Sequence, residues 1–219
     1  TFQGGTCAVP ATLVQTNCDY RLTCPDTTSC DSSSGVTFSA LTRTLTLANN
    51  ATLVLGGGYY NFCSVSVGNN AVITIAPGAK VSIFIDSTSD HGACSSLTSG
   101  TFTMSQGATF NAGGSALNAQ VFVYGNPSSL GTNQVSLQNV GSSAFLLDAP
   151  FSTINLAPSN NTVFEGAMMG YAVTIGQASN FTYEADSSTL ASGSLESFYR
   201  SYWEQCGGLG TPSAPTAGC

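Results

Sequence analysis

Short segments in which hydrophobic and polar residues alternate fill the middle of the chain. An alternation with a period of two is typical of β-strands that bury one face. We therefore expect an all-β protein built from many short strands. The apolar positions that define these segments are Leu45 and Leu47, Leu53 and Leu55, Val65 and Val67, Ile73 and Ile75, Val81, Ile83 and Ile85, Val121 and Val123, Ile154 and Leu156, and Val173 and Ile175.

The turns between these segments resemble one another and recur almost in phase. Five of them read ANNATLVL from 48, GNNAVITI from 68, SQGATFNA from 105, SNNTVFEG from 159 and ASNFTYEA from 178. Their marker residues are Asn50, Asn70, Gly107, Asn161 and Asn180. The gaps between successive markers are close to one, two, three and one times a unit of about 18 to 20 residues, which places missing markers near Thr88, Gly125 and Ser143.

A unit of that length matches one coil of a β-solenoid, in which each coil buries its inward side chains by stacking on its neighbours. We expect a single-domain β-solenoid (β-helix) of about seven to eight coils over residues 35–190. A β-sandwich is the alternative, because its turns also recur every 8 to 12 residues.

Both ends of the chain differ from the middle. Residues 1–34 have little periodicity and read as a disulfide-stapled arm or cap, in which three pairings of four cysteines are open. Residues 191–219 read as a short amphipathic helix followed by a disulfide-tied tail. The N-terminal cysteines are Cys7, Cys18, Cys24 and Cys30; those of the tail are Cys206 and Cys219.

The helical stripe has two interpretations: it packs on the flank of the solenoid, or it docks on a partner subunit. Its residues follow the spacing i, i+3, i+4, i+7, i+8 and are Leu195, Phe198, Tyr199, Tyr202 and Trp203.

Composition narrows the location and the partners. Eight cysteines with a single histidine are typical of an exported, extracellular protein whose thiols pair. We expect Cys63 to pair with Cys94, because the bond would pin an inserted loop to the adjacent coil.

The net charge of −7 with only four basic residues argues against nucleic-acid binding. No apolar run is long enough to predict a membrane span, and the start at Thr1 indicates a mature ectodomain.

Three segments resemble the β-solenoid domain of bacterial surface proteins associated with type IV pilins. They are GGGYYNFCSVSVGNNAVITIAPGAKVSIFIDS (56–87), FLLDAPFSTINLAPSNNTVFEGAMMGYAVTIGQASNFTYEAD (145–186) and SFYRSYWEQC (197–206). The resemblance implies a structural subunit of an extracellular filament, the surface-exposed component of a type IV pilus. The pilin helix that precedes the domain in that family is missing here: either it has been left out of this chain, or a separate partner supplies it. The expected partners are a helix-bearing pilin subunit and copies of this chain.

The chemistry-bearing residues do not favour an enzyme, and the sequence predicts no cofactor. Carboxylates are scattered, and a lone histidine cannot serve most hydrolytic triads. The polar cluster Asp86, Asp90 and His91 is a weak candidate for an acid–base or metal site. Glu184 and Asp186 are a weak candidate for Ca²⁺ binding. A polysaccharide lyase is therefore a minor alternative.

A second function class is a cell-surface adhesin that binds host or surface glycans. Aromatic rings stack on sugars, and Tyr59, Tyr60 and Tyr124 are the candidates. The sequons at Asn50, Asn160 and Asn180 are possible glycosylation sites. Thr-x-Thr pairs at 42–46 and 101–103 suggest an ice-binding face, but the segments VSL, INL and VTI interrupt the array.

Overall fold

The computed structural model describes residues 31–32, 35–39, 42–87, 94, 100–125, 130–131, 134–157, 163–176 and 180–183. This part of the chain is all-β: it has fifteen strands and one 3₁₀ turn, and none of its residues is in an α-helix. Four expected features lie outside the described residues: residues 1–30 of the arm expected at 1–34, the helical stripe at 195–203, the six terminal cysteines and Asn160.

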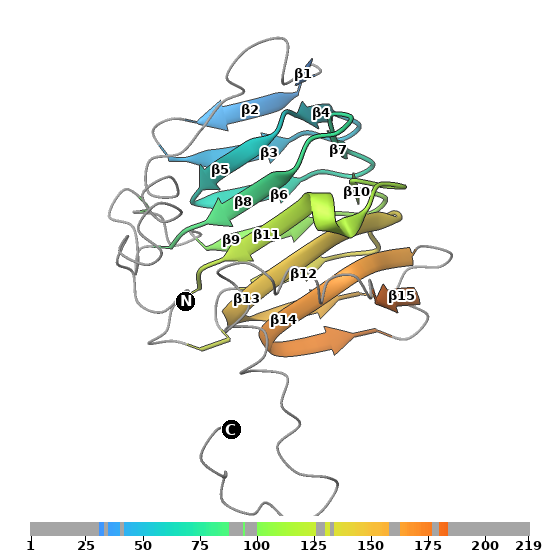
Figure 1. The fold of residues 1–219 in the computed structure, drawn as a ribbon. Helices are drawn as coiled ribbons and strands as arrows, with labels where there is room; N and C mark the ends of the chain where they lie inside the picture. The colour runs from blue at the N-terminus through green and yellow to red at the C-terminus, as the bar shows by residue number, and fades with distance from the viewer. Residues whose placement is uncertain are drawn as a thin grey trace, which may run out of the picture.

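The strands follow one another as in Figure 1. They are β1 Asp31–Ser32, β2 Val36–Ser39, β3 Thr44–Leu47, β4 Thr52–Leu55, β5 Gly58–Phe62, β6 Ser64–Val67, β7 Val72–Ile75, β8 Val81–Ile85, β9 Thr101–Met104, β10 Thr109–Phe110, β11 Ala119–Val123, β12 Gln134–Leu137, β13 Ser143–Leu156, β14 Val163–Ile175 and β15 Asn180–Tyr183. The 3₁₀ turn η1 spans Ala116–Asn118.

Strands distant in the sequence pair side by side in parallel. One column runs β3, β6, β9, β12, the second half of β13 and the second half of β14. A second column runs β5, β8, β11, the first half of β13, the first half of β14 and β15. A separate sheet has the order β1-β4-β7-β10. Pairing is antiparallel only for β1 with β4 and β2 with β3 among the described strands.

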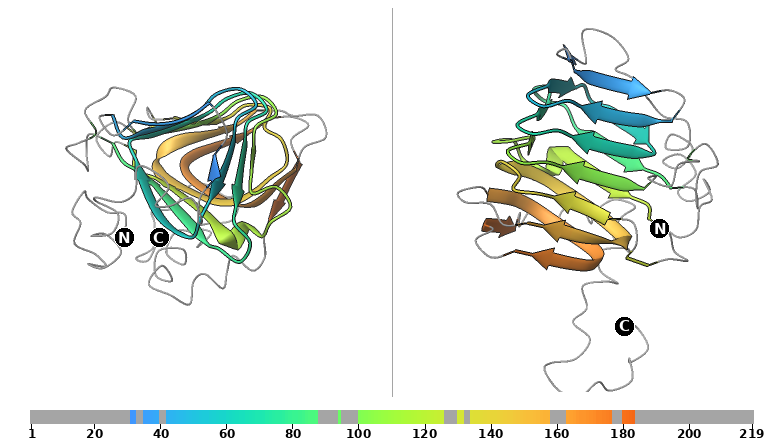
Figure 2. Two further views of the ribbon diagram at one scale, coloured as in Figure 1. Left: turned by 90° about the horizontal axis from the view of Figure 1, so that it is seen from above. Right: turned by 180° about the vertical axis from the view of Figure 1, so that it is seen from behind.

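The two columns belong to one curled sheet because β13 takes part in both. Its first half pairs with β11 and its second half with β12. The register between β13 and β14 shifts between Ala149 and Thr153, where both long strands turn the corner. Seen from above, the sheet curls around a central core (Figure 2). This parallel arrangement departs from the antiparallel facing sheets of the expected alternative, a β-sandwich.

The pairing of the strands corrects the counting of repeats. Leu45 pairs with Val65, one unit further along the chain, as the turn markers predict. Val65 then pairs directly with Phe102, so the long gap between the next two markers is one step and not two. The extra residues form an insertion between β8 and β9. The first column therefore has six parallel strands where the markers indicated about seven to eight repeats.

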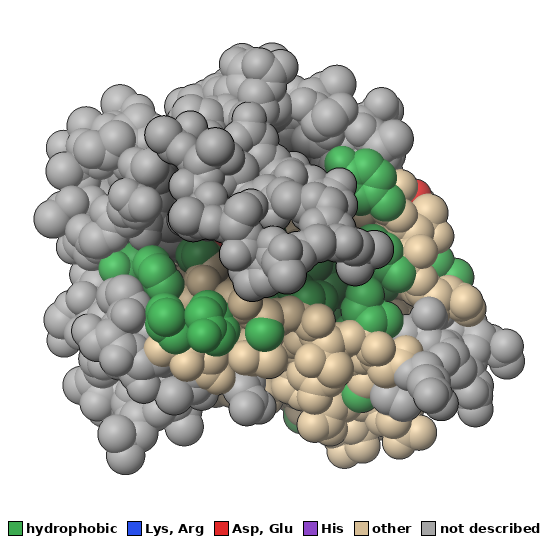
Figure 3. Space-filling model, turned by 90° about the horizontal axis from the view of Figure 1, so that it is seen from below, with side chains coloured by type: hydrophobic (Ala, Val, Ile, Leu, Met, Phe, Trp, Pro, Cys, Tyr) green, Lys and Arg blue, Asp and Glu red, His purple; other side chains and the backbone are tan. Residues whose placement is uncertain are grey.

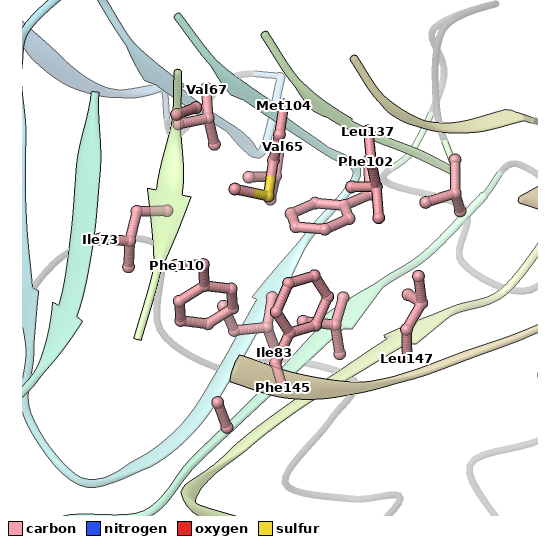
Figure 4. Close-up of a cluster of buried hydrophobic side chains, with 14 of the residues drawn as sticks. Val65, Val67, Ile73, Ile83, Phe102, Met104, Phe110, Leu137, Phe145 and Leu147 are labelled. Carbon is pink, nitrogen blue, oxygen red and sulfur yellow. The ribbon is translucent and has the colours of Figure 1, made fainter. Parts of the chain in front are cut away.

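The inward positions of all three sides meet in one hydrophobic core (Figure 4). Phe145 lies at its centre, fully buried, with its ring centroid 5.1 Å from that of Phe110, 5.9 Å from that of Phe102 and 4.8 Å from that of Phe164. Burying rings of this size stabilises the fold strongly, because each removes a large apolar area from water. The period of two in the sequence identified many of the aliphatic residues of this core, such as Val65, Ile73 and Ile83, but not its central phenylalanines.

Three of the five predicted marker residues, Asn50, Asn70 and Gly107, lie in turns at one corner and bond to the next turn along the stack. Asn161 lies outside the described residues, and Asn180 is the first residue of strand β15 instead of a turn residue. The Asn50 N–H donates to the Asn69 carbonyl, the Asn70 N–H to Gln106, and the Gly107 N–H to Asn139. Asn50, Asn70 and Asn139 have φ of 61°, 55° and 46°, a conformation that asparagine and glycine tolerate best. Because the turns at this corner require residues with positive φ, Asn and Gly recur at these markers.

Candidate functional site

A covalent staple joins the corner between β5 and β6 to the insertion. Cys63 and Cys94 form a disulfide with a Cα–Cα distance of 5.4 Å, which confirms the predicted pair. The backbone of Cys63 adds two hydrogen bonds: its N–H donates to the Arg43 carbonyl, 2.6 Å away, and its carbonyl accepts from the Gly100 N–H, 2.7 Å away. Cys63 therefore ties together the starts of β3, β6 and β9.

A buried polar chain of three side chains lies beside the staple. Arg43 donates from Nη2 to Oδ1 of Asn61, and Asn61 donates from Nδ2 to Oδ2 of Asp86. Asn61 and Asp86 are 0% and 1% exposed. The amide thus connects a positive and a negative group inside the protein. Because a buried charge without a partner is costly, each member depends on the other two.

Asp86 therefore takes part in this internal network and does not line an open site. Its other expected cluster members, Asp90 and His91, lie outside the described residues, as do Glu184 and Asp186. In the part of the chain that the structure describes, no group of three or more His, Cys, Asp or Glu side chains could hold a metal ion.

A second buried carboxyl, Asp148, was not singled out by the sequence. It lies on the face of β13 opposite the core, 3% exposed, in register with Phe122 and Met169. Burial raises the pKa of Asp148 to about 7. Its Oδ1 atom and the hydroxyl of Ser152 have no hydrogen-bond partner among the described residues. Acid–base hydrolysis of a glycosidic bond uses a pair of carboxyls, and the residues in register with Asp148 are both apolar.

A row of hydroxyl and amide side chains crosses the outer face of the first column. We call it the hydroxyl row; its members are in register from strand to strand and are exposed or half-buried. They are Thr37, Thr46, Ser66, Thr103, Ser136, Asn155 and Thr174. Neighbouring members are about 4.8 Å apart, the distance between paired strands. The row has no charged residue.

The hydroxyl row bears on the ice-binding interpretation of the threonine pairs. The segments VSL, INL and VTI were expected to interrupt the threonine array. Ser136 and Asn155 do interrupt it, whereas Thr174 of VTI is itself a threonine of the row; all three are the outward, polar residues of their segments. The row is uninterrupted in polarity but mixed in residue type, with serine and asparagine where an ice-binding face needs threonine.

The three candidate sugar-binding tyrosines lie in different environments. Tyr60 is fully buried and donates from its hydroxyl to the Gly56 carbonyl at 3.1 Å. Tyr124 is 4% exposed, with its ring centroid 5.7 Å from that of Phe151. Tyr59 is 37% exposed and lies against Phe84. Of these three, Tyr59 alone presents a large part of its ring to solvent.

Two sequons are accessible. Asn50 is exposed in its turn, and Asn180 is exposed at the start of β15. Among the described residues, no helix has the length and hydrophobicity to cross a membrane. A comparison of the chain with protein-family models, curated proteins and solved structures finds no match.

The staple generates a prediction about stability. Replacing both Cys63 and Cys94 by serine should lower the free energy of unfolding by about 3–4 kcal/mol, because a closed loop with a sequence separation of 31 restricts the unfolded chain. Urea unfolding followed by circular dichroism measures the change. Ser64→Ala, next to the staple, is the control and should change little; a loss below about 1 kcal/mol in the double variant would contradict a stabilising role.

The buried carboxyl generates a prediction about pH. The pKa of Asp148 is raised from 3.8 to about 7, so the folded state holds a proton that the unfolded state releases. Its contribution to stability is complete below pH 3.8 and is lost as the pH rises through about 7. Asp148→Asn should therefore gain stability relative to the natural protein as the pH rises from 4 to 8, by roughly 4 kcal/mol at the upper end.

Urea unfolding at a series of pH values tests this expectation. Glu165→Gln removes a half-buried carboxyl from the neighbouring strand β14 and is the matched control. Parallel pH profiles for the Asp148→Asn variant and the natural protein would show that this carboxyl does not titrate as its burial requires.

Proposed function

We propose that the protein is the globular structural subunit of an extracellular filament, of the type IV pilus kind, and that its curled sheet is a β-solenoid displayed outward. The observation that carries this proposal is the parallel pairing of successive strands, together with the disulfide beside them. Strands are paired in parallel from Thr44 to Tyr183, and the Cys63–Cys94 disulfide adds a covalent bond between them. A filament exposed outside the cell needs a unit of this kind, which resists unfolding and proteolysis.

The polar residues of the described part support a structural role. Arg43, Asn61 and Asp86 use polar atoms on one another, inside the protein. Asp148 is buried beside apolar neighbours. The hydroxyl row has hydroxyls and amides in place of acids and bases. The resemblance of residues 56–87 and 145–186 to pilin-associated domains also supports a structural role.

The proposed partner is a helix-bearing pilin subunit. Filaments of this kind assemble through a hydrophobic helix, and a subunit that carries such a helix would hold this chain at the filament surface. The cysteine-rich segment 1–34 is the first candidate for the contact, because it lies outside the expected solenoid and its four cysteines could fix its shape.

The filament proposal predicts where the protein is found. Antibodies against the purified chain should label regular filaments in electron micrographs of producing cells. Mass spectrometry of sheared, purified filaments should detect this chain together with a second, helix-bearing one in a fixed ratio. Preimmune serum and unsheared supernatant are the controls. A chain recovered only as free monomer, with unlabelled filaments, would refute the proposal.

The hydroxyl row favours a second candidate, an adhesin for neutral glycans. Regularly spaced donors and acceptors without net charge complement the hydroxyls of an uncharged polysaccharide. Ser66 lies near the middle of the row and is exposed, between Thr46 and Thr103. A ligand on this face would contact several strands at once.

A glycan array separates the two candidates. If the row binds glycans, Ser66→Asp should abolish a signal from neutral glycans, because a carboxylate would replace a hydroxyl at the contact. Tyr59→Ala tests the exposed aromatic ring instead and should leave that signal unchanged. Absence of binding by the folded natural protein would remove the adhesin candidate and leave the filament proposal intact.

A further inference from the structure

The hydrophobic core is open at the end formed by β14. Val173 and Ile175 pair with Ile154 and Leu156, so all four side chains lie on the core side of the sheet. Ile154 and Leu156 are 0% and 3% exposed, whereas Val173 and Ile175 are 41% and 48% exposed. Hydrophobic side chains are visible on the molecule seen from this side (Figure 3). Val173 and Ile175 are thus inward residues of a last strand that the described residues leave uncovered.

Among the described strands, none pairs with the second half of β14 on its side away from β13. β15 pairs with β14 only from Val163 to Gly166. The segment from Tyr171 to Ile175 follows this pairing and lies beside β13, and all five of its residues are exposed. An open strand edge beside exposed apolar side chains promotes aggregation, so a protein of this kind needs a cap at the end of its stack.

The sequence that follows β15 does not continue the apolar series of this column at the same spacing. Val135, Ile154 and Val173 succeed one another in the column at equal steps along the sequence, as do Leu137, Leu156 and Ile175. The next equal step in each series falls on Ser192 and Ser194. Serine adds almost no apolar surface, so a further strand at this register would leave Val173 and Ile175 uncovered.

Apolar residues resume immediately afterwards, at Leu195, in a helical spacing. The stripe has one apolar face, made of Leu195, Phe198, Tyr199, Tyr202 and Trp203. Only residues 184–194 separate it from β15. A connection of that length spans about 35–40 Å when extended, which is enough to reach β14 from the end of β15.

We propose that the helical stripe 195–203 of the same chain caps the open end, with its apolar face on Val173 and Ile175. The three observations above carry this assignment: two inward residues are exposed in the last strand, the repeat ends in serine at the next step, and an aromatic stripe follows within reach. The cap goes beyond the proposed filament role and does not depend on it. It also assigns the stripe to its own chain, which leaves the segment 1–34 for a partner.

Trp203 is the one tryptophan of the chain and reports directly on the cap. In the full-length protein its fluorescence should be blue-shifted and shielded from acrylamide. Val173→Asp combined with Ile175→Asp should shift the emission to the red and raise the quenching constant severalfold. Thr46→Asp combined with Ser66→Asp puts the same charge on exposed positions of β3 and β6 and should change neither quantity.

A second double variant, with substitutions in the stripe instead of in β14, distinguishes loss of the cap from misfolding of the β14 variant. Leu195→Ser combined with Phe198→Ser leaves every described residue unchanged and should release Trp203 to the same degree, with an unaltered far-ultraviolet circular dichroism spectrum in the strand region. Either of two results would overturn the proposed cap. One is free quenching of Trp203 in the natural protein; the other is Trp203 fluorescence that does not change in β14 variants that remain folded.

Light scattering at several concentrations separates the possible occupants. Shielding of Trp203 in a monomer, independent of concentration, supports capping by the same chain. Shielding that appears only together with a dimer would show that a second copy covers the end and would overturn the proposal. Neither result depends on whether the protein forms filaments.

Discussion

The structure depends on keeping parallel strands in register, so that every inward side chain lies directly over another. A shift of one residue would turn the apolar positions of a strand outward and its hydroxyls inward. Phe164 and Phe181 illustrate what register provides: they pair directly on β14 and β15, and their rings are 5.3 Å apart. The ring of Phe145 lies 4.8 Å from that of Phe164, although Phe145 itself pairs with Gly166. At one point of closest approach, Gly166 (φ 142°) leaves no room for a Cβ beside the Phe145 carbonyl. Loops outside the column can vary in length, because pairing alone fixes which residues face inward.

The same constraint explains the scarcity of charge. In a parallel column, a residue lies about 4.8 Å from its counterparts on both neighbouring strands. Like charges at that distance repel one another, whereas hydroxyls and amides can lie side by side. The hydroxyl row has this composition, and only 7% of the whole chain is charged. Where opposite charges do occur inside, at Arg43 and Asp86, the Asn61 amide separates and connects them.

The features of the fold that could be predicted from the sequence are those that depend on a local pattern of residues. The period of two identified β3, β4, β6, β7, β8, β11 and the second halves of β13 and β14, and three of the Asn and Gly turns identified one corner. The Cys63–Cys94 bond followed from the position of an insertion next to a repeat. The number of repeats was wrong because arithmetic on turn markers cannot distinguish a further repeat from a loop. The polar chain from Arg43 to Asp86 and the burial of Asp148 depend on which distant strands become neighbours, and no local pattern contains that information.

The two ends of the stack are not equivalent, and this asymmetry limits how the protein can assemble. At the N-terminal end, β2 runs antiparallel to β3, and its Val36 and Phe38 pack partly buried against the core. At the other end, Val173 and Ile175 have no such cover among the described residues. Stacking along the axis would have to join two unlike surfaces, one of which β2 partly covers. A cap on β14 would remove the second surface as well. Contacts between subunits would then use the flanks or the N-terminal segment, and the long uncharged side of the stack would remain exposed to the surroundings.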